Sequence, residues 1–137
     1  MILLSIKIIN FLYNVNLYKM NLNDCSDYKS VLKQAKQYYG NDVVLLPSTR
    51  LTKKYMIYNP YTHKFIQFGG MGYLDYTKYR QLYDLKTANL HRNRYLNRSL
   101  NIRGDWKNNP YSANFLSILL LWEFKPYNIE SIDLHYF

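Results

Sequence analysis

The sequence predicts a small α+β domain in which a short antiparallel sheet, with a central β-hairpin, packs against three or four helices. Three observations predict it. Hydrophobic residues make up 48% of the 137 residues, which is enough for a core without metal or disulfide staples. Two segments rich in strand-forming residues flank an Asn-Pro turn at residues 59–60. Several other segments carry apolar side chains at helical spacing.

Residues 1–19 are apolar, and the sequence leaves their role open. They partly alternate apolar and polar residues, which suits a strand, or they form an extension upstream of a true start at Met20. Lys7, Asn10 and Asn14 interrupt the stretch, which is shorter than the roughly 20 apolar residues of a spanning helix. We therefore expect no membrane insertion and a single α+β domain over residues 20–137.

The first predicted elements of the domain are a helix and a short strand. Asp24 or Ser26 can cap a helix over about residues 27–39, which Gly40 ends. Residues 43–46 form a continuous apolar run that Pro47 stops, so they predict a short buried strand.

A hairpin is predicted next. Residues 54–58 and 64–68 form its strands, and residues 59–62 form its turn, because proline presets the turn dihedral angle. Gly69, Gly70 and Gly72 then break the second strand. Their spacing does not match a phosphate-binding loop, since no Gly-Lys-Ser/Thr follows, and a structural bend is the favoured interpretation.

The second half of the chain is predicted to be mainly helical. Residues 75–85 and 88–100 predict helices that meet at a weak point near Thr87, and Asp75 is expected to cap the first. Residues 101–111 are loop-like. Ser112 then caps a helix over residues 113–124, which is the most apolar of the chain and must be buried.

Positive charge is concentrated in the middle of the chain. Residues 43–122 contain twelve lysines or arginines against Asp75, Asp84 and Asp105, which accounts for the whole formal charge of +9. Arg94 and Arg98 are one helical turn apart, so their repulsion costs a few tenths of a kcal/mol unless an anion offsets it. This pattern predicts an acidic partner, such as nucleic acid, an anionic membrane surface or an acidic protein surface, and nucleic acid or an acidic protein is the expected partner.

The expected polyanion-binding residues are the basic side chains of this region: Lys53, Lys54, Arg92, Arg94, Arg98 and Arg103. Planar guanidinium groups suit phosphates and carboxylates. A solvated helix face and intramolecular pairing are the alternatives for the arginines. The aromatic residues that would stack on a base or form an interface are Tyr95, Trp106 and Trp122, with core packing as the alternative.

We predict no catalytic site, no metal site and no cofactor, and hence a protein that is not an enzyme. Cys25 is the single cysteine, and the three histidines do not repeat at ligand spacing. The single cysteine also predicts a reducing, intracellular location. One enzymatic alternative is a degenerate metal-dependent nuclease. It requires Asp75 and Asp84 to meet in one cleft with Lys78 or His91.

Several short motifs follow one another between residues 50 and 122. They are Lys53-Lys54-Tyr55-Met56, Phe68-Gly69-Gly70-Met71-Gly72-Tyr73, Asp75-Tyr76-Thr77-Lys78, Arg94-Tyr95-Leu96-Asn97-Arg98, Gly104-Asp105-Trp106 and Leu120-Leu121-Trp122. Their order resembles that in a small, poorly characterised protein family of large and giant DNA viruses. The chain departs from the family pattern at Gln67 and Tyr79, where the family has histidines, and the acid expected soon afterwards is missing.

The resemblance implies a viral origin and an association with virions or viral DNA, and it supplies no catalytic residues. It places the protein in the host cytoplasm or a viral factory, or packaged in the virion. Binding to other virion proteins is a further implication. A structural, capsid-associated protein that acts through protein–protein contacts is therefore the alternative to nucleic-acid binding.

Overall fold

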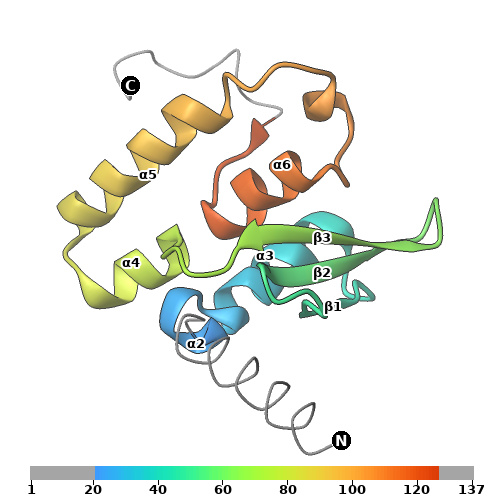
Figure 1. Ribbon diagram of the computed structural model, residues 1–137, viewed down its shortest axis with the longest axis horizontal. Coiled ribbons are helices and arrows are strands. Elements are labelled where there is room, and N and C mark those ends of the chain that lie inside the picture. Colours follow the sequence, from blue (N-terminus) through green and yellow to red (C-terminus); the bar gives the residue numbers. More distant parts are fainter. Residues whose placement is uncertain (1–20, 127–137) are drawn as a thin grey trace, which may run out of the picture.

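The computed structural model describes residues 21–126, and the expectations for residues 1–19 fall outside this part of the chain. Within it, three strands form an antiparallel sheet, and five α-helical segments surround the sheet (Figure 1). The predicted α+β class is confirmed. No helix of these residues is long and apolar enough to cross a bilayer.

The sheet has the strand order β1-β2-β3, with β1 at Leu45–Pro47, β2 at Lys53–Asn59 and β3 at Lys64–Gly70. The predicted hairpin of β2 and β3 is confirmed, and Tyr55 lies opposite Phe68. In its turn, the Asn59 Oδ1 accepts a hydrogen bond of 3.0 Å from the Tyr61 N–H. The first strand begins two residues later than predicted and includes Pro47, which an edge strand tolerates. The prediction that this strand is buried is wrong, because Leu45 is its only buried residue and Leu46 lies on the exposed side of this edge strand.

Two helices precede the sheet, namely α2 (Leu22–Cys25) and α3 (Tyr28–Tyr39). Gly40 ends α3 with a φ of 99°, as predicted. The predicted cap of α3 is wrong, because Asp24 lies inside α2 and Ser26 is the residue that ends it. Asp27 occupies the N-cap position of α3, and its carboxylate accepts a hydrogen bond of 2.6 Å from the Ser30 hydroxyl.

Helices α4 (Tyr76–Leu82) and α5 (Leu85–Ser99) follow the sheet. Asp75 caps α4 by accepting a hydrogen bond of 3.3 Å from the Lys78 N–H, so its predicted role as an N-cap is confirmed. The break between the helices lies at Tyr83 and Asp84, not at Thr87. Asp84 accepts a hydrogen bond of 2.8 Å from the Thr87 N–H, which starts α5 there.

The predicted helix over residues 113–124 is shorter and changes its geometry. After the short 3₁₀ turn η1 (Trp106–Asn108), Ser112 caps α6 (Ala113–Leu116), as predicted. The π-helical turn η2 (Ser117–Leu121) continues α6, and the Trp122 N–H bonds to the Ser117 carbonyl at 3.2 Å. All five residues of η2 are buried. Glu123 has a φ of 51°, which turns the chain out of the helix before Phe124.

The core lies between the sheet and the helices that follow and precede it. Tyr55, Ile57 and Phe68 of the sheet are fully buried together with Phe115 and Leu116 of α6. Figure 1 shows α3 behind the sheet and α6 beside β3, while α4 leads away from the sheet to α5. Helix α5 packs on α4, and Leu96 and Leu100 at its C-terminal end belong to the same core.

The buried tyrosines predict a loss of stability in alkali. Burial raises the pKa of Tyr55, whose hydroxyl donates to the Ser26 Oγ at 2.8 Å, and burial also raises the pKa of Tyr39. The unfolded chain releases these protons near pH 10, and the folded chain retains them. The free energy of unfolding should therefore fall as the pH rises above about 10.

Urea unfolding at a series of pH values between about 8 and about 11 measures this effect. The Tyr55→Phe variant lacks one of the tyrosines with a raised pKa. Its free energy of unfolding should therefore fall less steeply with pH than that of the wild type. Parallel curves for the two proteins would contradict the assignment to Tyr55.

Candidate functional site: a cationic cleft

A cleft of about 670 Å³ lies between the end of the hairpin and helix α5. It is lined by residues from the sheet, the loop after it, α4, α5, α6 and η2: Lys53, Lys54, Gly69, Gly70, Tyr73, Leu74, Tyr79, His91, Arg94, Tyr95, Arg98, Ala113, Asn114, Ser117, Leu121 and Trp122. Four of these side chains are lysine or arginine, and none carries a carboxylate. The volume is in the range of small-ligand pockets.

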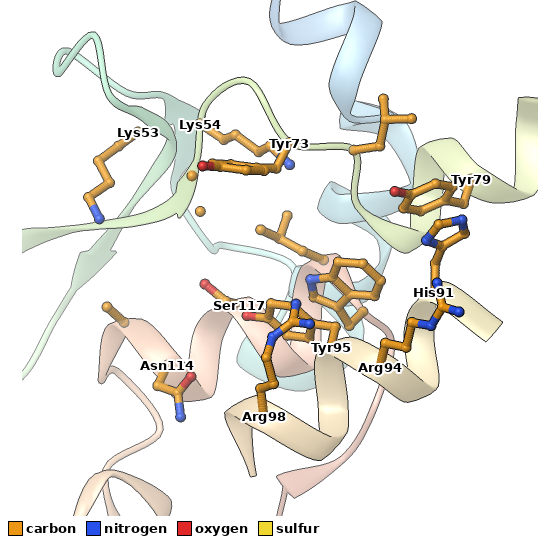
Figure 2. A pocket seen from close by; sticks show the side chains of 16 residues that line it. Lys53, Lys54, Tyr73, Tyr79, His91, Arg94, Tyr95, Arg98, Asn114 and Ser117 are labelled. Atoms are coloured by element: carbon orange, nitrogen blue, oxygen red, sulfur yellow. The ribbon is translucent and has the colours of Figure 1, made fainter. Parts of the chain in front are cut away.

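One wall of the cleft comes from the hairpin and the loop that follows it. Figure 2 shows Lys53, Lys54 and Tyr73 together on this side. Tyr73 is 76% exposed, although its ring packs against the Gly70 backbone. A Cβ atom on Gly70 would lie 3.2 Å from the Tyr73 ring, so glycine lets the ring lie close to the strand.

Gly69, in the same wall, has both a positive φ and close neighbours that leave no space for a side chain. Its φ of 81° is one that side chains rarely adopt, and a Cβ atom there would lie 2.8 Å from a methyl group of Leu121. The same atom would lie 3.2 Å from the Lys54 Cβ. Glycine at this position therefore allows η2 and the stem of Lys54 to pack against the end of β3.

Lys54 forms a buried ion pair with Asp75. The Lys54 Nζ lies 3.3 Å from the Asp75 Oδ2, and the two residues are 2% and 1% exposed. The Thr77 hydroxyl also donates to the carboxylate, and the Lys78 N–H caps it. The charge of Lys54 is thus neutralised next to the cleft, which is what a buried ammonium group requires.

The opposite wall comes from α5, α6 and η2. In Figure 2, Arg98 points from α5 toward the cavity, and Asn114 and Ser117 lie beside it. Arg94 and Arg98 are exposed, and their side chains form no hydrogen bond or ion pair with any residue between 21 and 126. Lys53 is half-buried, and its side chain also forms no hydrogen bond or ion pair within these residues. Three cations of the cleft are therefore available to a ligand.

Two aromatic stacks line the helical side. The Tyr95 and Trp122 rings lie parallel, with centroids 4.2 Å apart, and the Tyr79 and His91 rings lie parallel at 4.1 Å. Burial raises the pKa of Tyr95, although hydrogen bonds to Ser99 and Ser117 oppose that shift. Figure 2 shows the Tyr79–His91 pair at one end of the cavity. These rings form the end and the floor of the cleft.

The structure brings together only part of the predicted polyanion-binding set. Lys53, Lys54, Arg94 and Arg98 line the cleft, whereas Arg92 and Arg103 do not. The Arg92 guanidinium donates to the carbonyls of Trp122 and Glu123 and lies over the Tyr76 ring. This group joins α5 to the end of η2 and is already engaged. Arg103 is exposed in the loop after α5.

The three predicted stacking or interface residues differ in position. Tyr95 and Trp122 line the cleft, and they stack on each other. Trp106 lies outside it, is buried, and donates from Nε1 to the Ile102 carbonyl at 2.7 Å. Trp106 therefore packs in the core, which was the alternative for this residue.

Sequence reasoning missed Tyr73 and Tyr79 as residues of the site. The structure puts Tyr79 in the cleft wall next to His91. Tyr73 follows the glycines 69, 70 and 72, which was a usable signal. A large side chain after a flexible, glycine-rich turn has no strand neighbours to bury it.

The carboxylates of the nuclease alternative lie apart in the fold. Asp75 caps the start of α4, and Asp84 follows the end of this helix, so roughly 10 Å of helix separates them. Asp84 is fully exposed, whereas Asp75 is bonded to Lys54 and Thr77. Among residues 21–126, no three histidine, cysteine, aspartate or glutamate side chains group as metal ligands would.

Comparison with known protein families gives a partial match. The model of a family of unknown function, DUF5754, matches residues 43–80. This segment contains the sheet, the Lys54–Asp75 pair and most of α4, and it ends before α5. It therefore covers the hairpin wall of the cleft but not the arginine wall. No curated protein and no solved structure matches the chain.

The buried ion pair predicts an unusual order of stability among variants. Asp75→Asn keeps an oxygen to cap α4 but leaves the Lys54 ammonium buried without a counter-charge, which should cost about 3 kcal/mol or more. Adding Lys54→Met removes that buried charge. The double variant should therefore be more stable than Asp75→Asn alone in urea unfolding. A double variant less stable than the single one would contradict a pair governed by desolvation.

Gly69 predicts a second stability difference, with Gly72 as its control. Both glycines have positive φ, but nothing lies within 4 Å of a Cβ atom at Gly72. Gly72→Ala should therefore cost only the backbone strain, about 1 to 2 kcal/mol. Gly69→Ala should cost about 1 to 3 kcal/mol more, because Leu121 and Lys54 must move. Equal melting shifts for the two variants would show that Gly69 serves only the backbone.

Proposed function

We propose that the protein binds nucleic acid without catalysis, by holding phosphate groups in the cleft between Lys53 and the arginines of α5. One observation carries the proposal. The cleft collects three cations that are unpaired within residues 21–126, and no acidic side chain lines it. Unpaired like charges facing one hollow repel one another, so an anion that enters it relieves this repulsion.

The type of cation favours phosphate as the group bound. Arg94 and Arg98 present planar forks that can each donate two hydrogen bonds to phosphate oxygens. They are one helical turn apart on α5, about 6 Å along the axis at 1.5 Å a residue. Consecutive phosphates of a nucleic acid strand repeat at a similar distance, so one strand can engage both arginines.

The aromatic lining supports nucleic acid over an acidic protein as the partner. Tyr73 presents a largely exposed ring at the same cleft as the cations. Cationic grooves with aromatic side chains are typical of proteins that bind nucleic acid without sequence preference. The resemblance to proteins of large DNA viruses agrees with this proposal, because it implies an association with virions or viral DNA.

A second candidate function rests on the outer face of the sheet. Val44, Leu46 and Phe65 are each about 40% exposed there, and Met56 and Tyr58 alternate with the buried residues of β2. An apolar face of this kind suits a protein contact, as a structural virion protein requires. Such a contact would bury apolar surface and would depend little on salt, whereas phosphate contacts weaken steeply with salt.

The arginine wall predicts a specific loss of binding. Arg94→Ala/Arg98→Ala should weaken binding to a labelled oligonucleotide by about tenfold or more at low salt. It should also reduce the slope of log affinity against log salt by about one to two, because two phosphate contacts are lost. Fluorescence anisotropy across a salt series measures both quantities.

The matched control is Arg50→Ala/Arg103→Ala, which removes two exposed arginines outside the cleft. It has the same net charge as the test variant and should keep most of the wild-type affinity. Equal losses in the two variants would show that overall charge, and not the cleft, binds the nucleic acid. An absence of binding by the wild type at low salt would overturn the proposal and favour the protein-contact function.

A further inference from the structure

We infer that the cleft takes a single nucleic acid strand with one base unstacked against Tyr73, and does not take a duplex. This inference rests on the proposed function and specifies its ligand. The chemistry that the site recognises is a phosphate with an attached planar base. That chemistry is offered by a single strand and by a free nucleotide, whereas a duplex keeps its bases stacked and paired inside.

The size of the cleft is the first argument. A volume of about 670 Å³ is in the range of small-ligand pockets. A B-DNA duplex, whose major groove alone is about 12 Å wide, is too large to enter such a pocket and could contact only its rim. A single strand fits between the walls, and it can meet Lys53 and the arginines at the same time.

The position of Tyr73 is the second argument. One part of its ring packs on the Gly70 backbone, yet 76% of the residue is exposed. In Figure 2, the ring lies on the hairpin side of the cavity, and Arg98 and Ser117 lie on the other side. A base placed against this ring would have its phosphate within the reach of the opposite wall. Base–aromatic stacking needs only the face of the ring, so it is tolerant of sequence.

The other lining rings already have partners. Tyr95 stacks on Trp122, and Tyr79 stacks on His91. No ring contact joins Tyr73 to another aromatic residue within residues 21–126. Among the aromatic residues that line the cleft, Tyr73 therefore has a ring face that a ligand can contact. The two stacked pairs form the floor and the end of the cavity.

The experiment compares ligands and variants in one anisotropy assay. The ligands are a labelled single strand of about 15 nucleotides, its blunt duplex, and a labelled mononucleotide. The variants are Tyr73→Ala, Tyr73→Phe, and Tyr61→Ala as a control. Tyr61 is 84% exposed in the hairpin turn and does not line the cleft. Tyr73 is so exposed that its replacement should not affect folding, and thermal unfolding checks this.

We expect the single strand to bind at least about tenfold more tightly than the duplex. Tyr73→Ala should weaken single-strand binding by about tenfold, while Tyr73→Phe and Tyr61→Ala should keep it. The duplex, which can contact only the rim, should be unaffected by Tyr73→Ala. Retention of affinity in Tyr73→Phe would show that the ring face, and not the hydroxyl, makes the contact.

Three results would overturn the inference, and they differ in whether the proposed function remains supported. Equal or tighter duplex binding, still dependent on Arg94 and Arg98, would remove the single-strand preference but leave the proposed function intact. A mononucleotide that binds as tightly as the strand would assign the cleft to free nucleotides. Failure of all three ligands to bind would remove the proposed function as well.

Discussion

The buried ion pair of Lys54 with Asp75 is the interaction on which the rest of the site depends. Lys54 belongs to β2, and Asp75 is the N-cap residue of α4, at the end of the loop that follows β3. The Asp75 N–H also bonds to the Cys25 carbonyl at 3.1 Å, which ties the same point to α2. Helix α5 follows α4 directly in the chain, so the position of this junction also determines where Arg94 and Arg98 lie relative to the hairpin. An unpaired charge at either position would be costly to bury, so the two side chains hold this junction together.

The basic residues in and near the cleft fall into two groups. Some have charges that are bonded within the fold, and the others have charges that remain available. Lys54 is neutralised by Asp75, and Arg92 is held by backbone carbonyls at the end of η2. Arg94 is only two residues from Arg92, but it faces the cavity because residues two apart on a helix point to different sides. The helix thus divides this basic segment into a face that supports the fold and a face that lines the cleft.

The sequence predicted most of the elements, because their signals are local. The hairpin was readable from Asn59 and the flanking strand residues, and the ends of α3 and α4 from Gly40 and Asp75. The π-helical turn was not readable. The apolar run over residues 113–124 has the composition of a longer helix, and packing against α3 and β3, together with the turn at Glu123, changes its geometry. These are tertiary effects that no local pattern carries.

The site was less predictable than the fold, because Lys54 at its centre is buried although the alternation of β2 predicts that it is exposed. Burial in β2 alternates from Tyr55 to Asn59, and this alternation would leave Lys54 on the outer face. Lys54 is nevertheless buried against Asp75 at the start of α4, and Gly69 gives its stem the space. The residues that were predicted as one set of phosphate contacts therefore have two functions. Lys54 positions the walls, while Lys53, Arg94 and Arg98 keep the free charge that a ligand can meet.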